Sequence, residues 1–356
     1  MGKIDEFLNN FSGEGTKRTY RSIIKKYFRT IGENPETYFK GRGKSTDSDL
    51  EKYEKDIRMF WQSINTFPPN TINSAMACIR VFLTDNYVDL PMKLWKELRN
   101  RTRGSRSVIE DYVPVREDLK KLLSHGNALE RAMFLTLVSS GMRIGEVTKI
   151  KETDVDFNNK PVKIYIRREY TKTGNKRITF VSDECAEALK EWLKEKPAWL
   201  ERAVKLLNFP QYTKSVVDDR VFPMTSDVAR VKWNKLLKKA GKPFTEQDFS
   251  TKNAHFKLHP HCLRKFFRSN LSGNGMEVDV VEALMGHEDG LQRAYRKYNE
   301  KQLGDMYLIA MQKVMIFSIP TDLTGINQEI TNLKEENQDL RKDMQKLMVK
   351  LATLTD

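Results

Sequence analysis

The chain has 356 residues, 39% of them hydrophobic and 31% charged, which is enough for two domains with ordinary cores. No stretch approaches the roughly 20 apolar residues of a membrane span, and the first ten residues lack the apolar segment of a signal peptide, so we expect neither. The 62 Lys and Arg against 48 Asp and Glu leave a net charge of +14, which favours nucleic acid as a partner over a mere excess of solvated lysines.

The first hundred residues show the spacing of amphipathic helices. Apolar residues recur every three or four positions over residues 16–31 and again over residues 50–64. Asn70 opens a third such segment, and a fourth helix holds Leu94 and Trp95. The polar face of the first segment carries the basic residues Lys17, Arg18, Arg21 and Lys25. The pattern predicts a bundle of four short helices, over residues 1–98, with basic outer faces.

A polar, arginine-rich stretch follows over residues 99–113. It has no apolar period and carries Arg99, Arg101, Arg103 and Arg106. Because guanidinium groups bind phosphates, we expect this stretch to be an interdomain linker that lies along a nucleic-acid backbone.

Residues 114–318 predict a second domain that is mainly α-helical with a small antiparallel β-sheet. Two helices occupy residues 117–139, and the second of them is strongly apolar. Residues 162–168 alternate as a strand does, and residues 177–181 form its partner across the turn Thr173-Gly174-Asn175. Further helices are predicted at about residues 183–206, 226–240, 261–272 and 277–285.

Residues 323–354 carry a seven-residue repeat. One heptad position holds Leu323, Ile330, Asn337, Met344 and Leu351, and a second apolar position recurs from Ile326 to Leu354. If these two positions are a and d of a heptad, Glu329 and Glu336 lie at g and face basic residues at the next e position of a parallel partner. The single Asn337 at an a position favours a two-stranded coiled coil. A core face of the preceding domain is the alternative, but nearly five uninterrupted heptads favour a coiled-coil dimer over residues 320–356.

Five polar motifs lie in the second domain, and each alone has an ordinary structural explanation. They are Arg143 with Glu146 at a turn after an apolar helix, Lys172 at the hairpin tip, His261 and Arg264 on one helix face, Gly286-His287 at a helix end, and Tyr295 with Tyr298 nearby. A helix start, an exposed turn and a packed aromatic ring account for such residues singly. Their combination in one domain is the informative observation.

The combination resembles the tyrosine recombinase (phage integrase) family. The family's Gly-x-Arg-x-x-Glu turn is matched by residues 141–146, and its Lys-Thr-Gly hairpin tip by residues 172–174, with Arg177 as the second basic residue. Its His-x-Leu-Arg helix is matched by residues 261–264 and its Leu-Gly-His turn by residues 285–287. The matches follow the family's order across residues 112–315, and residues 1–98 resemble the family's N-terminal core-binding (SAM-like) DNA-binding domain.

The nucleophile position departs from the family pattern. The family's tyrosine usually lies one residue farther from the histidine of the Leu-Gly-His turn than Tyr295 lies from His287. The residues that follow Tyr295 match those that typically follow the family's nucleophile. We therefore expect a shortened turn before Tyr295, with Tyr298 as the alternative nucleophile.

The resemblance implies DNA cleavage and rejoining through a 3′-phosphotyrosine intermediate. Arg143, Arg264 and His287 would bind the non-bridging phosphate oxygens, which arginine forks suit because they can bind two oxygens at once. A phenol with a pKa of about 10 needs a base or a positive field, and His261 is the implied base. Lys172 would be the general acid and Glu146 would orient Arg143. The phosphotyrosine conserves the bond energy, so we expect no cofactor.

Metal binding has weak support in the sequence. His255, His259, His261 and Cys262 cluster, but their spacings match no tetrahedral zinc set, so we expect no metal. The three cysteines are odd in number and far apart, which indicates a reducing compartment. The resemblance implies a cytoplasmic, nucleoid-associated protein of a prokaryotic host.

Three functions compete at this stage. The first is site-specific recombination that integrates or excises a mobile element, with a tetramer assembled on paired double-stranded DNA sites. The others are a DNA-binding relative without catalysis and a type IB-like topoisomerase. The five motifs disfavour the inactive relative, and the predicted coiled coil favours recombination over relaxation because recombination pairs protomers on two sites.

Removal of residues 320–356 is expected to weaken self-association, because it deletes the apolar seam that would hold two chains together. Sedimentation of the full chain and the truncated chain over a concentration series measures the effect. Identical sedimentation of the two chains would contradict a coiled-coil dimer.

Overall fold

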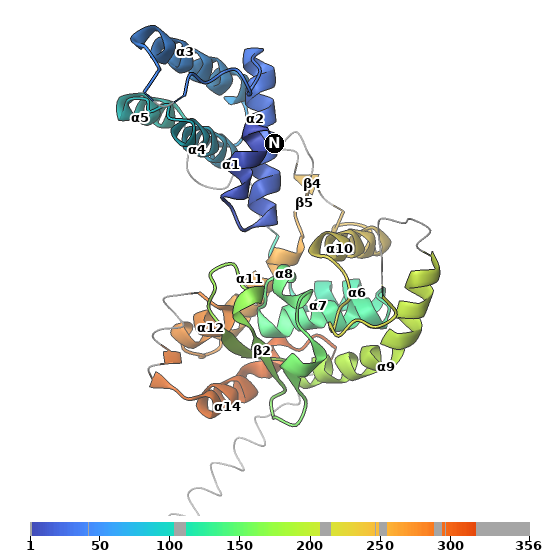
Figure 1. The fold of residues 1–356 in the computed structure, drawn as a ribbon. Coiled ribbons are helices and arrows are strands. Elements are labelled where there is room, and N and C mark those ends of the chain that lie inside the picture. Colours follow the sequence, from blue (N-terminus) through green and yellow to red (C-terminus); the bar gives the residue numbers. More distant parts are fainter. Residues whose placement is uncertain are drawn as a thin grey trace, which may run out of the picture. The chain divides into compact units, whose positions relative to one another are not determined.

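The computed structural model describes residues 2–41, 43–102, 112–206, 215–245, 247–248, 255–287, 294–295 and 297–317 (Figure 1). The chain divides into two compact units, Met1–Glu110 with Gln247–Lys257, and Asp111–Glu246 with Leu258–Asp356. Within the described residues, no helix combines the length and the apolar character required to span a bilayer. The predicted coiled coil over residues 320–356 lies outside the described residues, as do Arg103 and Arg106.

The first unit is a helical bundle. Its helices are α1 (Lys3–Asn9), α2 (Glu14–Ile31), α3 (Asp47–Ile64), α4 (Pro69–Asp85) and α5 (Met92–Arg101). Helices α2 to α5 correspond to the four that the periodicity predicts. The short helix α1 was not predicted because its seven residues give too few apolar positions to reveal a period, although Phe7 and Leu8 are buried.

Helix α5 runs past the predicted end of the helical region at residue 98. Arg99 and Arg101 lie on its last turn, and Arg101 pairs with Glu97 at 2.6 Å, so the prediction of a linker is wrong for these two residues. Cations are favoured at a helix C-terminus, where they oppose the negative end of the helix dipole. The same positive charge that predicted a linker therefore extends the helix.

The second unit is mainly helical with a small antiparallel sheet, as predicted. Its helices are α6 (Arg116–Ser124), α7 (Ala128–Ser140), α8 (Ile144–Val147), α9 (Asp183–Leu206), α10 (Ser226–Ala240), α11 (Pro260–Ser272), α12 (Val278–Met285) and α14 (Glu300–Ala310). Its strands are β1 (Val155–Asp156), β2 (Lys163–Ile166) and β3 (Arg177–Phe180), in that spatial order. Short 3-10 turns complete it at η1 (Glu152–Asp154), η2 (Arg168–Tyr170) and η3 (Met311–Val314). A two-stranded ladder of β4 (Gln247–Asp248) and β5 (His255–Phe256) is grouped with the first unit instead.

The β2–β3 hairpin is shorter than the sequence indicates. Strand β2 ends at Ile166, and its register pairs Lys163 with Phe180 and Ile166 with Arg177. The chain then turns into η2 because Tyr170 is buried and its hydroxyl donates to Asp154 Oδ2 at 2.9 Å. Helices α12 and α14 pack against β3 (Figure 1). Strand β3 therefore contacts both its hairpin partner β2 and the helices α12 and α14.

Helix α7 is the core of the second unit. All its residues from Leu129 to Ser140 are buried except Arg131, and a helix that is apolar all round must be surrounded by other elements. It packs against α9 and α11. The helix ends at Gly141, whose φ of +61° is left-handed, and a Cβ there would lie 2.5 Å from Phe267 Cδ1 of α11. Gly141 thus fixes both the end of α7 and the approach of α11.

Gly141→Ala is expected to lower the free energy of unfolding by about 2–5 kcal/mol, from left-handed backbone strain together with overpacking against Phe267. Gly145→Ala is the matched control, because a Cβ at Gly145 meets nothing within 4 Å. Chemical denaturation of both variants measures the difference. Equal stability of the two variants would show that the close approach of Phe267 is unimportant.

Candidate active site

A buried carboxylate, Glu146, joins two arginines from different elements. Arg143 precedes α8, and its backbone N–H donates to Glu146 Oε2 at 2.9 Å while Nη1 donates to Oε1 at 3.0 Å. Arg177 begins β3 and donates Nη1 to Oε1 at 3.2 Å and Nη2 to Oε2 at 2.7 Å. The contact of Arg177 with Glu146 is a bidentate guanidinium–carboxylate pair, the geometry that arginine favours. Arg143 keeps 33% of its side chain exposed, whereas Arg177 is fully enclosed.

The charge of Glu146 is maintained by its arginine partners. Burial alone would raise the pKa of this carboxyl, but the hydrogen bonds and charge of Arg177, with the contacts from Arg143, hold the pKa below its ordinary value. Glu146 is therefore ionised at neutral pH and neutralises part of the positive charge around it.

Arg177 also binds the end of α12. Its Nε donates to the carbonyl of Leu284 at 3.0 Å, and its guanidinium lies against Gly286. A Cβ at Gly286 would lie 2.5 Å from Arg177 Nη1, and the φ of this glycine is +79°. The sequence prediction named Arg177 only as a second basic residue of the hairpin and missed this role. All four positions of β3 are buried, so its first residue, a charged one, needs a buried partner, and the sequence does not show this burial.

Arg264 is the third guanidinium of the cluster and is 3% exposed. Its Nη1 donates to the carbonyl of Gly141, and its Nη2 donates to the carbonyl of Met285 at 2.7 Å. Burial, together with the positive charges of Arg143 and Arg177, lowers the pKa of Arg264 to about 9. The positive charges of the three guanidinium groups thus repel one another, and Glu146 pairs with two of them, Arg143 and Arg177. An anion that enters between them would relieve this repulsion.

His287 lies beside Arg264, as the motif predicts. Arg264 Nη2 and His287 Nε2 are 3.0 Å apart, and Nδ1 of the same ring contacts Glu282 Oε2 of α12. The group of Arg143, Glu146 and Arg177 and the pair of Arg264 and His287 therefore meet at the end of α12, where Arg177 binds the carbonyl of Leu284 and Arg264 that of Met285. Glu282 was not among the predicted residues, because a glutamate on a short helix carries no distinctive sequence signal.

The other two predicted proton-transfer residues are exposed. His261 lies on the first turn of α11, one turn before Arg264, with its ring 6.2 Å from that of His259. Lys172 lies in the connection between β2 and β3. His261 therefore shares α11 with Arg264, and Lys172 precedes β3, which begins with Arg177.

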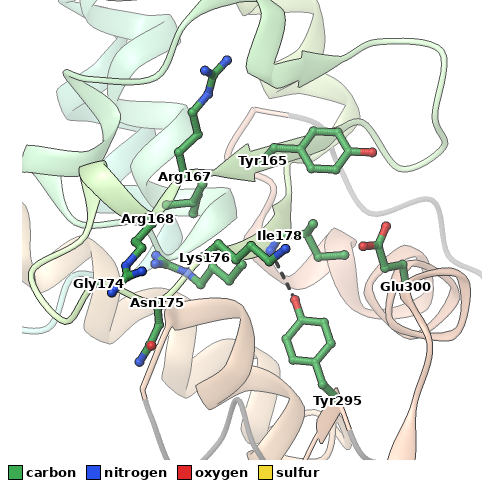
Figure 2. Close-up of a pocket in the computed structure, with 11 residues that line it drawn as sticks. Tyr165, Arg167, Arg168, Gly174, Asn175, Lys176, Ile178, Tyr295 and Glu300 are labelled. Atoms are coloured by element: carbon green, nitrogen blue, oxygen red, sulfur yellow. Dashed lines mark hydrogen bonds between the residues drawn. The ribbon is translucent and has the colours of Figure 1, made fainter.

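Tyr295 lines a cleft with a volume of about 970 Å³ beside the β2–β3 hairpin (Figure 2). Figure 2 shows its hydroxyl directed at β3, where it accepts a hydrogen bond from the backbone N–H of Ile178 at 3.2 Å. Arg177 lines the same cleft, together with the further basic residues Arg167, Arg168 and Lys176. Burial and the negative charge of Glu300 raise the pKa of Tyr295, while the Ile178 N–H and the charge of Arg177 oppose the rise. The cleft therefore places the phenol, which donates to no carboxylate among the described residues, beside several basic residues and one glutamate, Glu300.

Tyr298 has a different environment. Its hydroxyl donates to Glu277 Oε2 at 2.7 Å, and this hydrogen bond to a carboxylate raises its pKa. A neighbouring negative charge disfavours the phenolate that a nucleophile must form. The surroundings of Tyr295 thus suit nucleophilic attack better than those of Tyr298.

The predicted DNA-binding residues of the first unit lie on α2 and α5. Arg18, Arg21 and Lys25 are exposed on α2 and Arg99 is exposed on α5. Lys17 pairs with Glu14 at 2.9 Å and Arg21 pairs with Asp5 at 2.5 Å. Part of the positive charge on α2 is therefore neutralised within the unit.

No group of three His, Cys, Asp or Glu side chains within the described ranges could hold a metal ion. The thiols of Cys78, Cys185 and Cys262 are buried, and burial raises the pKa of Cys78 and Cys185 to about 12. The side chain of His255, one member of the sequence cluster, lies outside the described part of the chain.

Residues 115–303 match the model of the phage integrase family. The chain is 22% identical over 289 residues to tyrosine recombinase XerA of Saccharolobus solfataricus, across 78% of this chain and 80% of the relative. It is also 22% identical over 310 residues to a tyrosine recombinase of Thermosipho africanus, across 81% of this chain and 92% of the relative.

Two solved structures share the fold. A lambda integrase dimer bound to a COC′ core site matches with a TM-score of 0.50 at 14% identity, over 84% of this chain and 97% of that one. The Tn1549 transposon integrase in complex with transposon right end DNA matches with a TM-score of 0.51 at 16% identity, over 84% and 95%.

Glu146→Gln is expected to lower the free energy of unfolding by about 3–5 kcal/mol at neutral pH, because it leaves Arg177 buried without a counter-charge. Denaturant titration measures the loss. Adding Arg177→Met as a second substitution should restore much of the stability, since both members of the buried pair are then gone. A double variant as unstable as Glu146→Gln alone would contradict this explanation.

The pair of Glu146 and Arg177 makes the free energy of unfolding depend on pH. Because the folded pKa of Glu146 lies below the unfolded value of about 4.3, its ionisation stabilises the fold above that value and the contribution is lost as the pH falls through the folded pKa. The difference in free energy of unfolding between wild type and Glu146→Gln, measured by denaturant titration over a pH series, should therefore be largest near neutral pH and shrink in acid.

Proposed function

The chain belongs to the phage integrase family, and from this membership we propose that it is a site-specific DNA recombinase that cuts and rejoins strands through a phosphotyrosine at Tyr295. The observation that carries the proposal is the arginine cluster. Arg143 and Arg177 both act on the buried Arg264, and Arg177 lines the cleft that holds the hydroxyl of Tyr295. A phosphodiester is the anion that such a cluster and nucleophile would handle together.

The arginines would act on the charge that develops during attack. Arg143 and Arg264, with His287, would donate hydrogen bonds to the non-bridging oxygens as the pentacoordinate phosphorus forms. Arg177 would hold Glu146, and through it Arg143, in place. Preorganised donors of this kind lower a barrier because they need no reorganisation when the charge appears.

The bond changes follow from the nucleophile. Tyr295 Oη would bond to phosphorus as the bond to the 5′-oxygen breaks, which leaves a 3′-phosphotyrosine and a free 5′-hydroxyl. His261 would take the phenol proton, and Lys172 would give a proton to the leaving oxygen. Attack by a 5′-hydroxyl from the partner strand reverses the steps and completes strand exchange. The reaction requires neither ATP nor a metal to conserve the bond energy.

We propose that the natural use is integration or excision of a mobile element. The fold is shared with a lambda integrase and a transposon integrase, each solved with DNA. Residues 1–98 would bind core DNA, residues 114–318 would carry the chemistry, and the remaining arginines of the 99–113 stretch would contact phosphates. The predicted coiled coil over residues 320–356 would pair protomers, and a tetramer would form on paired sites on the DNA of a prokaryotic nucleoid.

Tyr295→Phe is expected to abolish covalent attachment to DNA, because it removes the attacking oxygen. The substrate is a pool of nicked duplexes with randomised sequence, from which covalent protein–DNA complexes are recovered after denaturation. Tyr298→Phe is the matched control and should still form the complex. Attachment that survives in Tyr295→Phe and disappears in Tyr298→Phe would move the nucleophile to Tyr298.

The same pool separates the other functions. A wild-type chain that binds DNA but never attaches to it would be a DNA-binding relative without catalysis. A chain that relaxes a supercoiled plasmid but never joins two recovered sites would be a topoisomerase. Joining of two recovered sites is the result expected of a recombinase.

A further inference from the structure

The last turn of α12 places Glu282 and His287 side by side. The backbone N–H of His287 donates to the carbonyl of Glu282 at 3.0 Å, and that of Gly286 donates to Ala283 at 2.9 Å. With Gly286 in the left-handed conformation, these bonds form the Schellman turn that ends many helices. In such a turn the two residues joined by the hydrogen bond that spans more of the chain, here Glu282 and His287, often make an apolar contact. Here their side chains form an imidazole–carboxylate pair instead.

The position of the imidazole proton follows from the neighbours of the ring. Arg264 Nη2 lies 3.0 Å from His287 Nε2, and a guanidinium can only donate hydrogen bonds. Nε2 must therefore accept, which puts the proton of a neutral ring on Nδ1. Nδ1 faces Glu282 Oε2, so the carboxylate accepts that proton's hydrogen bond. The two contacts specify one tautomer and one ring orientation.

The carboxylate is itself held from the other side. Arg268 Nε donates to Glu282 Oε1, and Arg268 lies on α11 one turn after Arg264. Burial raises the pKa of Glu282, but its hydrogen bonds with Arg268 and His287 outweigh burial and keep it below the ordinary value. Two arginines of one helix thus flank the histidine and the glutamate, in the order Arg264, His287, Glu282 and Arg268.

We propose that Glu282 is a positioning residue for strand cleavage: it accepts from Nδ1 of His287 and so keeps Nε2 beside Arg264, where the scissile phosphate would bind and where Nε2, once it is also protonated, would donate to a phosphate oxygen. The proposal rests on the recombinase function proposed above. Glu282 does not touch the reacting atoms. It acts through His287, and Arg268 stabilises its charge from outside the pocket.

The test uses the full chain and a nicked duplex recovered from the randomised pool, with single-turnover covalent attachment and DNA affinity measured separately. Glu282→Ala is expected to slow attachment roughly 10-fold to 100-fold, as for a lost charge-assisted hydrogen bond, without weakening DNA binding. Glu282→Gln should recover part of the rate, because its amide oxygen can still accept from Nδ1. Asp279→Asn, which removes another acid from α12, is the matched control and should attach at the wild-type rate.

A double-mutant cycle separates positioning from a general effect on stability. Adding Glu282→Ala to His287→Ala should cost no further rate, because the residue through which Glu282 acts is already absent. Arg268→Ala, which removes the same ion pair from the other side, shows how much of the loss comes from weaker packing of α11 and α12.

Two results would overturn the proposal while leaving the recombinase function intact. One is attachment by Glu282→Ala at the wild-type rate, and the other is an equal loss of rate whether or not His287 is present. If neither the wild type nor Asp279→Asn attaches to any duplex of the pool, the proposed function fails, and the positioning role fails with it.

Discussion

The buried pair of Arg177 and Glu146 is the interaction on which the arrangement of the second unit depends. It links the first residue of β3 to the short helix α8, and Arg177 extends the link to the carbonyl end of α12. Burying either charge without the other would cost several kcal/mol. The packing of β3, α8 and the end of α12 is therefore stable only when the guanidinium and the carboxylate are paired. The more exposed Arg143 inherits its position from the same carboxylate.

The end of α12 provides a second constraint. The carbonyls of Leu284 and Met285, which no further helical turn satisfies, accept hydrogen bonds from Arg177 and Arg264. The negative end of the helix dipole thus faces two buried cations. Mutual repulsion among the arginines is offset in part by these backbone carbonyls and in part by the buried carboxylate of Glu146. A site built in this way keeps its positive potential available for a phosphate.

Sequence periodicity predicted the amphipathic helices, and the hairpin followed from an alternating strand with a turn signal, whereas the buried helix α7 was predicted from its apolar run. Periodicity failed for α1, which is too short to show a period, and for the last turn of α5, where arginines extend a helix instead of a linker. The motifs named Arg143, Glu146 and His287, which lie in one cluster with Arg264. They named Arg177 only as the second basic residue of the hairpin and did not include Glu282, since the contacts of these residues with Glu146 and His287 appear only in three dimensions.

Tyr295 was preferred to Tyr298 because of the residues that follow it in the sequence. The surroundings of the two hydroxyls agree with that preference, because one accepts from a backbone amide in a cleft with basic residues and the other donates to a carboxylate. Gly286 has a consequence of a different kind. Any side chain at that position would push the Arg177 guanidinium away from its partners. A single added methyl group at this glycine could therefore disable the site while every ionisable residue stays in place. A survey of relatives that checks only the polar residues of the motif would count such a protein as active.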